Sequence, residues 1–453
     1  MAFAHTLFYF VIVIGVLVAI HEFGHFWVAR KAGVKVLRFS IGFGKVLWSY
    51  QKTPDSTEYV LSAIPLGGYV KMVDEREGEV DAADLPYAFN RQALSARIAI
   101  VAAGPIFNLV LAVALFWSVL IIGESGIKPI VGMVAPNTLA AKAGFADGDE
   151  ITAVNGKATV TWTDALSVVI AAALDGDQAI NISTKSLDGQ DSVKVLQLAE
   201  NEAQNPEDFY QQLGFKPWSP KLKPIIGKVL PDSAALAANL KEQDLIISAD
   251  GVAINDWQQW VDTVKTHAGL AIALIIERDG VRMPLTITPK SVTVEQKTEG
   301  KIGAAVFVPE DLIKSVTVEY SLGPVAAIPV AFETTWYYSY TTVKMMGRML
   351  MGKASVENLS GPISIAQYAG QSADMGLVHF LKFMALVSVS LGVLNLLPVP
   401  VLDGGHLLFF VLEGIKGSPV SEKIQLFFQK MGMALLMSLM ALAMVLDVQR
   451  LFH

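Results

Sequence analysis

The residues best suited to chemistry form a short run near the start of the chain, His21-Glu22-Phe23-Gly24-His25. Positions i and i+4 share one face of a helix, so the two imidazoles of this H-E-x-x-H motif can bind one zinc ion. Glu22 lies between them and can act as the general base that takes a proton from water. The motif therefore predicts zinc-dependent hydrolysis. The competing interpretation is a polar helix end that simply reaches an interface.

A catalytic zinc site normally has three protein ligands and one open position. The chain contains no cysteine, so the third ligand must be a histidine, an aspartate or a glutamate. The best candidate is Asp403, in the segment NLLPVPVLDGGH at residues 395–406. His406 is expected to support the site without binding the metal, or to be an ordinary buried helix residue. Taken alone, the same segment could equally be a turn followed by a helix cap.

The composition indicates that these residues lie in a membrane protein. Hydrophobic residues make up 53% of the chain, charged residues make up 17%, and the mean hydropathy is +0.46. Each predicted spanning helix is near the roughly 20 residues that a helix needs to cross the hydrocarbon core. The predicted spans are residues 1–29, 98–123, 376–402 and 425–448. The first contains the H-E-x-x-H motif, and a charge at the bilayer centre costs roughly 2–3 kcal/mol, so these residues need a use.

The distribution of basic residues predicts how the spans are oriented. Six of them follow the first span with no acidic residue among them: Arg30, Lys31, Lys35, Arg38, Lys45 and Lys52. The positive-inside rule therefore puts residues 30–97 on the cytoplasmic side and both chain ends on the other side, the periplasm of a Gram-negative bacterium. The net charge of −7 and the pI of about 5.6 do not favour a nucleic-acid partner.

The segment between the second and third spans contains an internal repeat with an offset of 95 residues. Pro129–Gly132 matches Pro224–Gly227, and Trp162 matches Trp257. Each copy has the pattern of strands, a tight turn, a helix and further strands, which predicts α+β modules at 127–221 and 222–310. The pattern resembles circularly permuted bacterial PDZ domains; the alternative is a β-rich pair without a ligand.

Residues 311–375 are apolar but interrupted by charges and contain a cluster of aromatic residues. They are predicted to lie as an amphipathic segment on the outer membrane surface. The predicted fold class is thus a polytopic α-helical membrane protein with four spanning helices, a membrane-dipping β region at 30–97 and two α+β PDZ domains.

Taken together, these features resemble the site-2 protease family. An intramembrane H-E-x-x-H motif is followed far downstream by N-x-x-P-x-P-x-L-D-G, and tandem PDZ modules separate the second and third spans, as in the bacterial sigma-E branch of that family. The resemblance covers essentially the whole chain. It implies a zinc metalloendopeptidase of the bacterial inner membrane that cuts transmembrane segments of single-span proteins. The implied substrates are anti-sigma factors already shortened on the outer side and remnant signal peptides, with the PDZ pair filtering access.

The resemblance also implies residues that bind the substrate. Gly42 and Gly44 correspond to a G-x-G segment in the membrane-dipping β region, and the strand with Val60 and Ser62 belongs to the same sheet. An extended substrate could add to such a sheet as a strand, which would unwind it for cleavage. Asn395 corresponds to an asparagine that contacts the substrate or orients the site. The alternatives are a structural hairpin that caps the site and an asparagine that joins two helices.

Two other functional classes fit parts of the sequence. A metal transporter could line its ion path with intramembrane histidine and aspartate, but it needs no general base, and the spans show no repeated halves. A non-catalytic PDZ scaffold would explain the modules but not the intact set of ligands and base.

Overall fold

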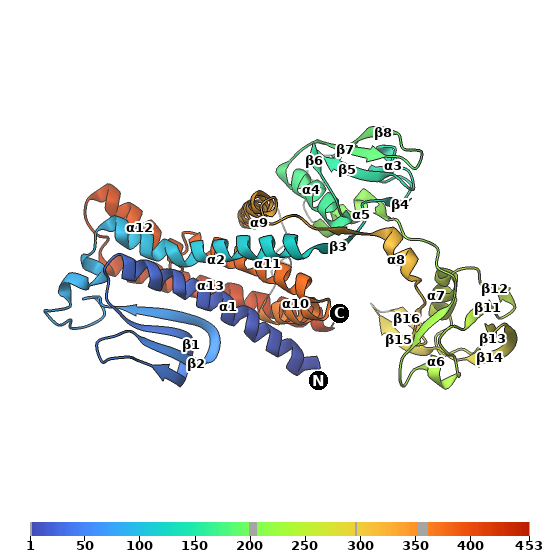
Figure 1. The fold of residues 1–453 in the computed structure, drawn as a ribbon, viewed down its shortest axis with the longest axis horizontal. Coiled ribbons are helices and arrows are strands. Elements are labelled where there is room, and N and C mark those ends of the chain that lie inside the picture. Colours follow the sequence, from blue (N-terminus) through green and yellow to red (C-terminus); the bar gives the residue numbers. More distant parts are fainter. Residues whose placement is uncertain (1, 199–205, 295–296, 352–360, 453) are drawn as a thin grey trace. The chain divides into compact units, whose positions relative to one another are not determined.

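A computed structural model describes residues 2–198, 206–294, 297–351 and 361–452. The chain divides into two compact units. One unit contains the residues up to Glu124 together with Tyr320–Phe452, and the other contains Ser125–Glu319. Figure 1 labels the elements of both.

The first unit is built around long apolar helices. Four helices in the described part of the chain are long and apolar enough to cross a membrane. They are α1 (Ala2–Lys31), α2 (Leu94–Ile122), α11 (Leu377–Leu396) and α13 (Glu422–Phe452). Both α1 and α11 pack along α2. Glycine permits the second of these contacts, because a Cβ atom on Gly392 of α11 would lie 3.0 Å from the carbonyl oxygen of Pro105.

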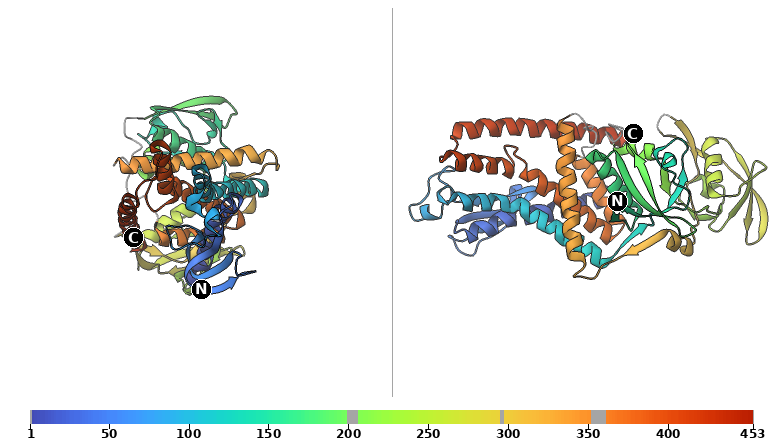
Figure 2. Two further views of the ribbon diagram at one scale, coloured as in Figure 1. Left: turned by 90° about the vertical axis from the view of Figure 1, so that its left-hand side faces the viewer. Right: turned by 90° about the horizontal axis from the view of Figure 1, so that it is seen from above.

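The described residues of this unit also form the helices α9 (Ala327–Leu350), α10 (Pro362–Asp374) and α12 (Asp403–Lys416). Helix α9 packs on α2 and α11 and runs across the direction of the long helices (Figure 2). Helix α10 instead packs against α1, where a Cβ atom on Gly370 would lie 2.8 Å from Thr6 Oγ1. The predicted surface segment therefore includes a helix that packs into the bundle; residues 352–360 of that segment lie outside the described residues.

Between α1 and α2, the chain forms a small bent sheet from β1 (Val36–Tyr50) and β2 (Glu58–Met72). β1 and β2 pair with each other and both strands bend, so the sheet consists of four strand segments, two from each strand. Ser40, for example, faces Tyr69 on one side and Val60 on the other. The resulting order of segments is 68–72, 36–41, 58–62 and 46–50. Short 3-10 turns at Leu85–Tyr87 and Phe89–Arg91 lead on to α2.

The second unit contains two modules with separate hydrophobic cores, one within residues 131–215 and the other within 226–302. Their sheets have the equivalent strand orders β6-β5-β7-β8 and β12-β11-β13-β14. The first module consists of β4 (Val131–Val134), α3 (Leu139–Lys142), β5 (Glu150–Val154), β6 (Lys157–Ala158), α4 (Trp162–Asp175), β7 (Ala179–Lys185), β8 (Asp191–Gln197), α5 (Pro206–Leu213) and β9 (Phe215–Pro217).

The second module repeats this plan. It consists of β10 (Ile226–Val229), α6 (Ala234–Ala237), β11 (Leu245–Ala249), β12 (Val252–Ala253), α7 (Trp257–Thr266), β13 (Ile272–Arg278), β14 (Val281–Ile287), β15 (Lys290–Val294), β16 (Lys297–Lys301) and β17 (Ala304–Val306). The first five elements begin 95 residues after their counterparts, the offset seen in the sequence repeat. After the second module come α8 (Glu310–Val316) and β18 (Thr317–Tyr320), which pairs with β3 (Glu124–Ile127).

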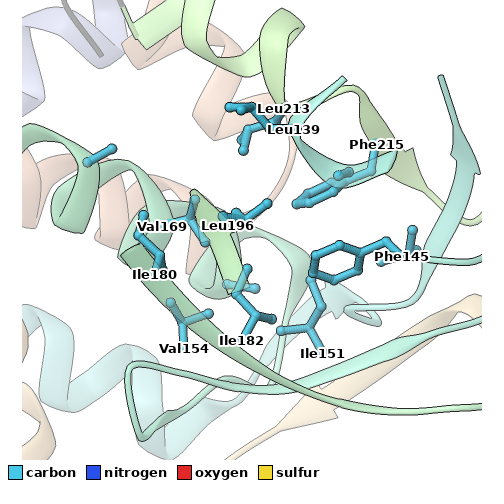
Figure 3. Packing of buried hydrophobic residues seen from close by; sticks show 14 of the residues in the cluster. Leu139, Phe145, Ile151, Val154, Val169, Ile180, Ile182, Leu196, Leu213 and Phe215 are labelled. Carbon is cyan, nitrogen blue, oxygen red and sulfur yellow. The ribbon is translucent and has the colours of Figure 1, made fainter. Parts of the chain in front are cut away.

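Each module is organised by its main helix and its alternating strands. A capping box between Thr161 and Asp164 begins α4, and the Asp256 carboxylate caps α7. In the first module, Ile180 and Ile182 alternate with exposed neighbours and point into the core (Figure 3). The cores are therefore complete within each copy of the repeat.

Candidate metal centre and active site

Three side chains from two distant parts of the chain converge on one point. His21 and His25 lie one turn apart on α1, and Asp403 is the first residue of α12. The His25 Nε2 atom lies 3.3 Å from His21 Nε2, while Asp403 Oδ2 lies 3.2 Å from His21 Nε2 and 3.6 Å from His25 Nε2. Three donors bound to a tetrahedral zinc ion at about 2.0–2.1 Å would be about 3.3–3.4 Å apart. The donor set and its spacing therefore fit zinc, and Asp403, the residue expected to be the third ligand, lies beside the two histidines.

Asp403 reaches this point because the chain stops being helical just before it. Helix α11 ends at Leu396, and the following turn contains two prolines, which cannot continue a helix. Gly404 and Gly405 allow α12 to start in close contact with that turn, because a Cβ atom on Gly405 would lie 2.5 Å from the carbonyl oxygen of Val399. Within the turn, Val401 has a φ of 112°, which is strained for a β-branched residue. The ligand is thus held by a tight and strained turn.

Hydrogen bonds from α2 orient both imidazoles. Nδ1 of His25 lies 2.8 Å from the carbonyl oxygen of Ile100, which can only accept, so Nδ1 carries the proton and Nε2 is free to bind metal. Nδ1 of His21 lies 3.2 Å from the side-chain amide of fully buried Asn108. When the Asn108 amide nitrogen faces His21, the Asn108 Oδ1 atom is buried without a hydrogen-bond partner. When the amide group is flipped, Oδ1 faces His21 instead and can accept the proton on its Nδ1 atom.

Glycines bring α1 and α2 into contact at the same level. A Cβ atom on Gly24 would lie 2.5 Å from the carbonyl oxygen of Ala103. A Cβ atom on Gly104 would lie 2.6 Å from Cε1 of His25 and 2.9 Å from Cε1 of His21. Any larger residue at these positions would move the helices or the imidazoles, so the two glycines are part of the site.

Glu22 is 8% exposed, and its side chain extends from α1 to the small sheet. A Cβ atom on Gly68 would be 2.7 Å from Glu22 Cγ and 2.6 Å from the carbonyl oxygen of Ser40. Among the described residues, none forms a hydrogen bond or ion pair with the Glu22 carboxylate. A carboxylate that is held by packing but keeps its oxygens free is suited to accept a proton.

A cavity of about 790 Å³ extends from the metal ligands and is named the metal cavity here. Its wall includes His25, Val70, Met72, Asp74, Arg76, Arg97, Asp403, His406, Phe410, Glu413 and Glu422. Arg97 near the start of α2 pairs with Glu413 near the end of α12, and its guanidinium carbon lies 5.1 Å from the centre of the Phe410 ring. This buried pair ties the helix that carries Asp403 to the helix that orients the histidines. His406 lines the cavity, as expected for a residue that supports the site.

The structure corrects the expected position of the substrate-binding edge. The segment with Val60 and Ser62 is paired on both sides, since Val60 faces both Ser40 and Ser49. Gly42 and Gly44 have φ values of 91° and 84° and make the bend that lets β1 curl, and a Cβ atom on Gly42 would lie 2.9 Å from the carbonyl oxygen of Ser62. These residues build the interior of the sheet, because the curl hides the strand that the sequence suggested was free.

The sheet segment next to the active site is instead 68–72, named the active-site edge here. Within the described part of the chain it is paired only on the side of residues 36–41. Gly68 lies against Glu22, and Val70 and Met72 line the metal cavity. Asn395 is the penultimate residue of α11, is half-buried, and forms no hydrogen bond with another described residue. Its expected role toward a substrate stays a prediction.

Comparison with known proteins supports this assignment. A model of peptidase family M50 matches residues 9–439. The regulator of sigma-E protease RseP of Escherichia coli is 43% identical, with all of both chains aligned. The RseP of Salmonella typhimurium is 43% identical over 98% of each chain. A Neisseria meningitidis protein, whose name describes it as a zinc metalloprotease, is 44% identical over 99% of each chain. The chain therefore belongs to peptidase family M50 and is a zinc-dependent metalloprotease of the membrane.

Proposed function

We propose that this protein is an intramembrane protease of the site-2 type, which hydrolyses peptide bonds in the transmembrane segments of single-span proteins. One observation carries the proposal: the H-E-x-x-H motif lies within an apolar helix long enough to span a membrane, and its histidines converge with Asp403 at zinc-ligand spacing. A protease centre in such a helix is suited to substrates that are themselves in the bilayer.

His21, His25 and Asp403 would hold the zinc ion, with Ile100 and Asn108 fixing the histidine tautomers. The zinc ion would supply Lewis-acid polarisation of water and of the scissile carbonyl group. Glu22 would take the proton from the attacking water on a carboxylate oxygen and then pass it to the leaving amine nitrogen. The metal cavity, with its polar wall, would let water reach this point at membrane depth.

A helical transmembrane segment must be unwound before its peptide bonds can be cut, since their polar groups are shielded in the helix. The active-site edge is suited to this task because it offers backbone groups beside Glu22. An extended substrate that pairs with residues 68–72 would gain main-chain hydrogen bonds and lie along the wall that contains Val70 and Met72. Asn395, near the end of α11, would contact the substrate or help to orient the site.

The two modules are proposed to be PDZ domains that filter substrates. Their shared strand order and separate cores support two independent modules, and the basic residues after α1 support a periplasmic location for them. In the same orientation both chain ends are periplasmic, the catalytic residues lie toward the cytoplasmic side, and the bilayer is the bacterial inner membrane. Two of the relatives are named as regulators of sigma-E, which supports anti-sigma factors as a substrate class. Remnant signal peptides are proposed as a second class because they too are single apolar segments in the bilayer.

The proposal is tested with purified protein in lipid nanodiscs and a single-span model substrate. The expected result is cleavage that stops when zinc is chelated and returns when zinc is restored, with mass spectrometry locating the cut inside the apolar segment. Cleavage confined to the soluble flanks of the substrate would contradict an intramembrane site.

A further inference from the structure

A second cavity, separate from the metal cavity, lies where α1 meets the small sheet. It has a volume of about 640 Å³ and is named the basic cleft here. It is formed by the end of α1, the turn between β1 and β2, and the loop before α2. Its polar lining includes three cations, two carboxylates and three tyrosines: Arg30, Lys35, Lys52, Asp55, Asp84, Tyr50, Tyr59 and Tyr87.

The charges in the basic cleft are unequally paired. The Lys35 Nζ atom bridges both carboxylate oxygens of Asp84, at 2.7 and 2.9 Å. Among the described residues, neither Arg30 nor Lys52 has a carboxylate within 4.0 Å. With Asp84 neutralised by Lys35, two free cations face one further carboxylate, that of Asp55. The cleft therefore has an excess of positive charge. Its Arg30 guanidinium lies over the Phe26 ring and has no carboxylate partner among the described residues.

The position of the basic cleft matches the level of lipid headgroups. Arg30 is in the last turn of α1, a helix long enough to span the bilayer. Tyr50 stacks with Trp48 at 6.3 Å between ring centres, and both rings are exposed, as is typical of aromatic residues at a membrane interface. Next to Trp48 in the outer sheet segment, Leu47 and Val46 are also exposed, so apolar side chains are available near the cleft for contact with an acyl chain. The cleft thus combines a phosphate-binding head with an apolar tail region.

We propose that the basic cleft binds the phosphate headgroup of an anionic phospholipid from the inner leaflet. The Arg30 fork would bind the phosphodiester oxygens, and Lys52 would add a second charge from the opposite wall. An excess of positive charge favours an anionic lipid such as phosphatidylglycerol over zwitterionic phosphatidylcholine. This inference rests on the membrane orientation given under Proposed function, but not on the catalytic roles assigned there.

The test is native mass spectrometry of the purified protein with phosphatidylglycerol or phosphatidylcholine added in detergent. We expect the unmodified protein to retain phosphatidylglycerol preferentially, and the double variant Arg30→Gln/Lys52→Gln to bind it on the order of 10-fold more weakly. The matched control is Lys31→Gln/Lys45→Gln, which removes two charges from the same basic run at positions that do not line the cleft. The control should retain the lipid.

Three outcomes would overturn the inference. Equal loss in both double variants would mean general charge attraction rather than a built site. Equal retention of the two lipids by the unmodified protein would mean that phosphate charge is not recognised. Displacement of the lipid by inorganic phosphate at matched concentration would make the ligand a free anion. Zinc content and substrate cleavage, measured on the same variants, report on folding and on the proposed protease activity independently of lipid retention.

Discussion

Gly104 of α2 lies directly beside His25 of α1, so close that a Cβ atom would stand 2.6 Å from the Cε1 atom of the imidazole. The metal site therefore depends on a residue that has no functional group at all. The close approach lets the Ile100 carbonyl oxygen accept a hydrogen bond from His25 and places the Asn108 side chain within hydrogen-bond distance of His21.

The first prediction is that Gly104→Ala displaces His25 and weakens zinc binding by at least about 10-fold, with a matching loss of cleavage. The matched control is Gly15→Ala, since a Cβ atom on Gly15 meets nothing within 4 Å in the same helix pair. Zinc content measured by plasma mass spectrometry after dialysis compares the two. Normal zinc affinity in Gly104→Ala would show that the imidazoles do not need this space.

The second prediction separates the metal ligand Asp403 from its neighbour His406. Asp403→Ala removes a bond to zinc, so both zinc occupancy and cleavage should be lost. His406→Ala removes only a residue of the cavity wall and should leave most zinc bound, with affinity reduced by no more than about 10–100-fold. Zinc stoichiometry and cleavage are measured for both variants. Loss of zinc from His406→Ala but not from Asp403→Ala would reverse the assignment.

The third prediction concerns the active-site edge. Successive backbone N–H groups of a strand point to opposite sides, so one of the two neighbours Tyr69 and Val70 has an N–H group that faces away from residues 36–41. Proline is placed at each position in turn, and one of the two variants loses this outward donor. That variant should cut helix-stable substrates less well, and substrates with helix-breaking residues nearly normally. Proline at Ser49, on the far edge of the sheet, is the control and should not discriminate. An equal loss for both substrates in the Tyr69 and Val70 variants would point to a structural role for the edge.

The fourth prediction is that removal of both modules, residues 127–310, broadens substrate choice without abolishing cleavage. His21, Glu22, His25 and Asp403 all lie in the other unit of the chain. The modules can then act by excluding substrates with bulky outer domains, which is specificity through a penalty on the wrong partner. Full-length and shortened forms of one single-span substrate are compared. A zinc-loaded deletion variant that still rejects the full-length form would contradict exclusion by the modules.

Much of this site could be predicted from the sequence because its chemistry is local. The i, i+4 spacing predicted that His21 and His25 share one face, and the segment NLLPVPVLDGGH supplied Asp403 as the expected third ligand. The structure brings the three side chains together. The repeat offset of 95 residues located the modules because both copies keep the same order of elements. These signals survive in a single sequence because they depend on residue type and spacing alone.

The remaining features depend on contacts between distant segments. Nothing in the alternating pattern of residues 58–64 shows that β1 curls around to pair with both of their sides, so the sequence alone left Val60 and Ser62 as candidates for strand addition by a substrate. Asn108 and Gly104 appeared only as polar and small residues within an apolar helix; a search for residues that interrupt the apolar run of α2 could have found them. The full extent of α12 was not predicted: the sequence analysis expected at most a helix cap after the proline-rich turn, whereas the helix runs over Asp403–Lys416.

The measurement that tests the central claim most directly uses Glu22→Gln. Glutamine keeps the shape of the side chain that packs against Gly68 but cannot take a proton from water, while His21, His25 and Asp403 are unchanged. Zinc content and cleavage of the single-span substrate are measured on the same preparation. We expect the variant to hold one zinc ion per chain, as the unmodified protein does, and to cleave about 10²–10⁴-fold more slowly. A variant that still cleaves at the normal rate, or one that has lost its zinc, would contradict the role of Glu22 as the base beside a three-ligand site.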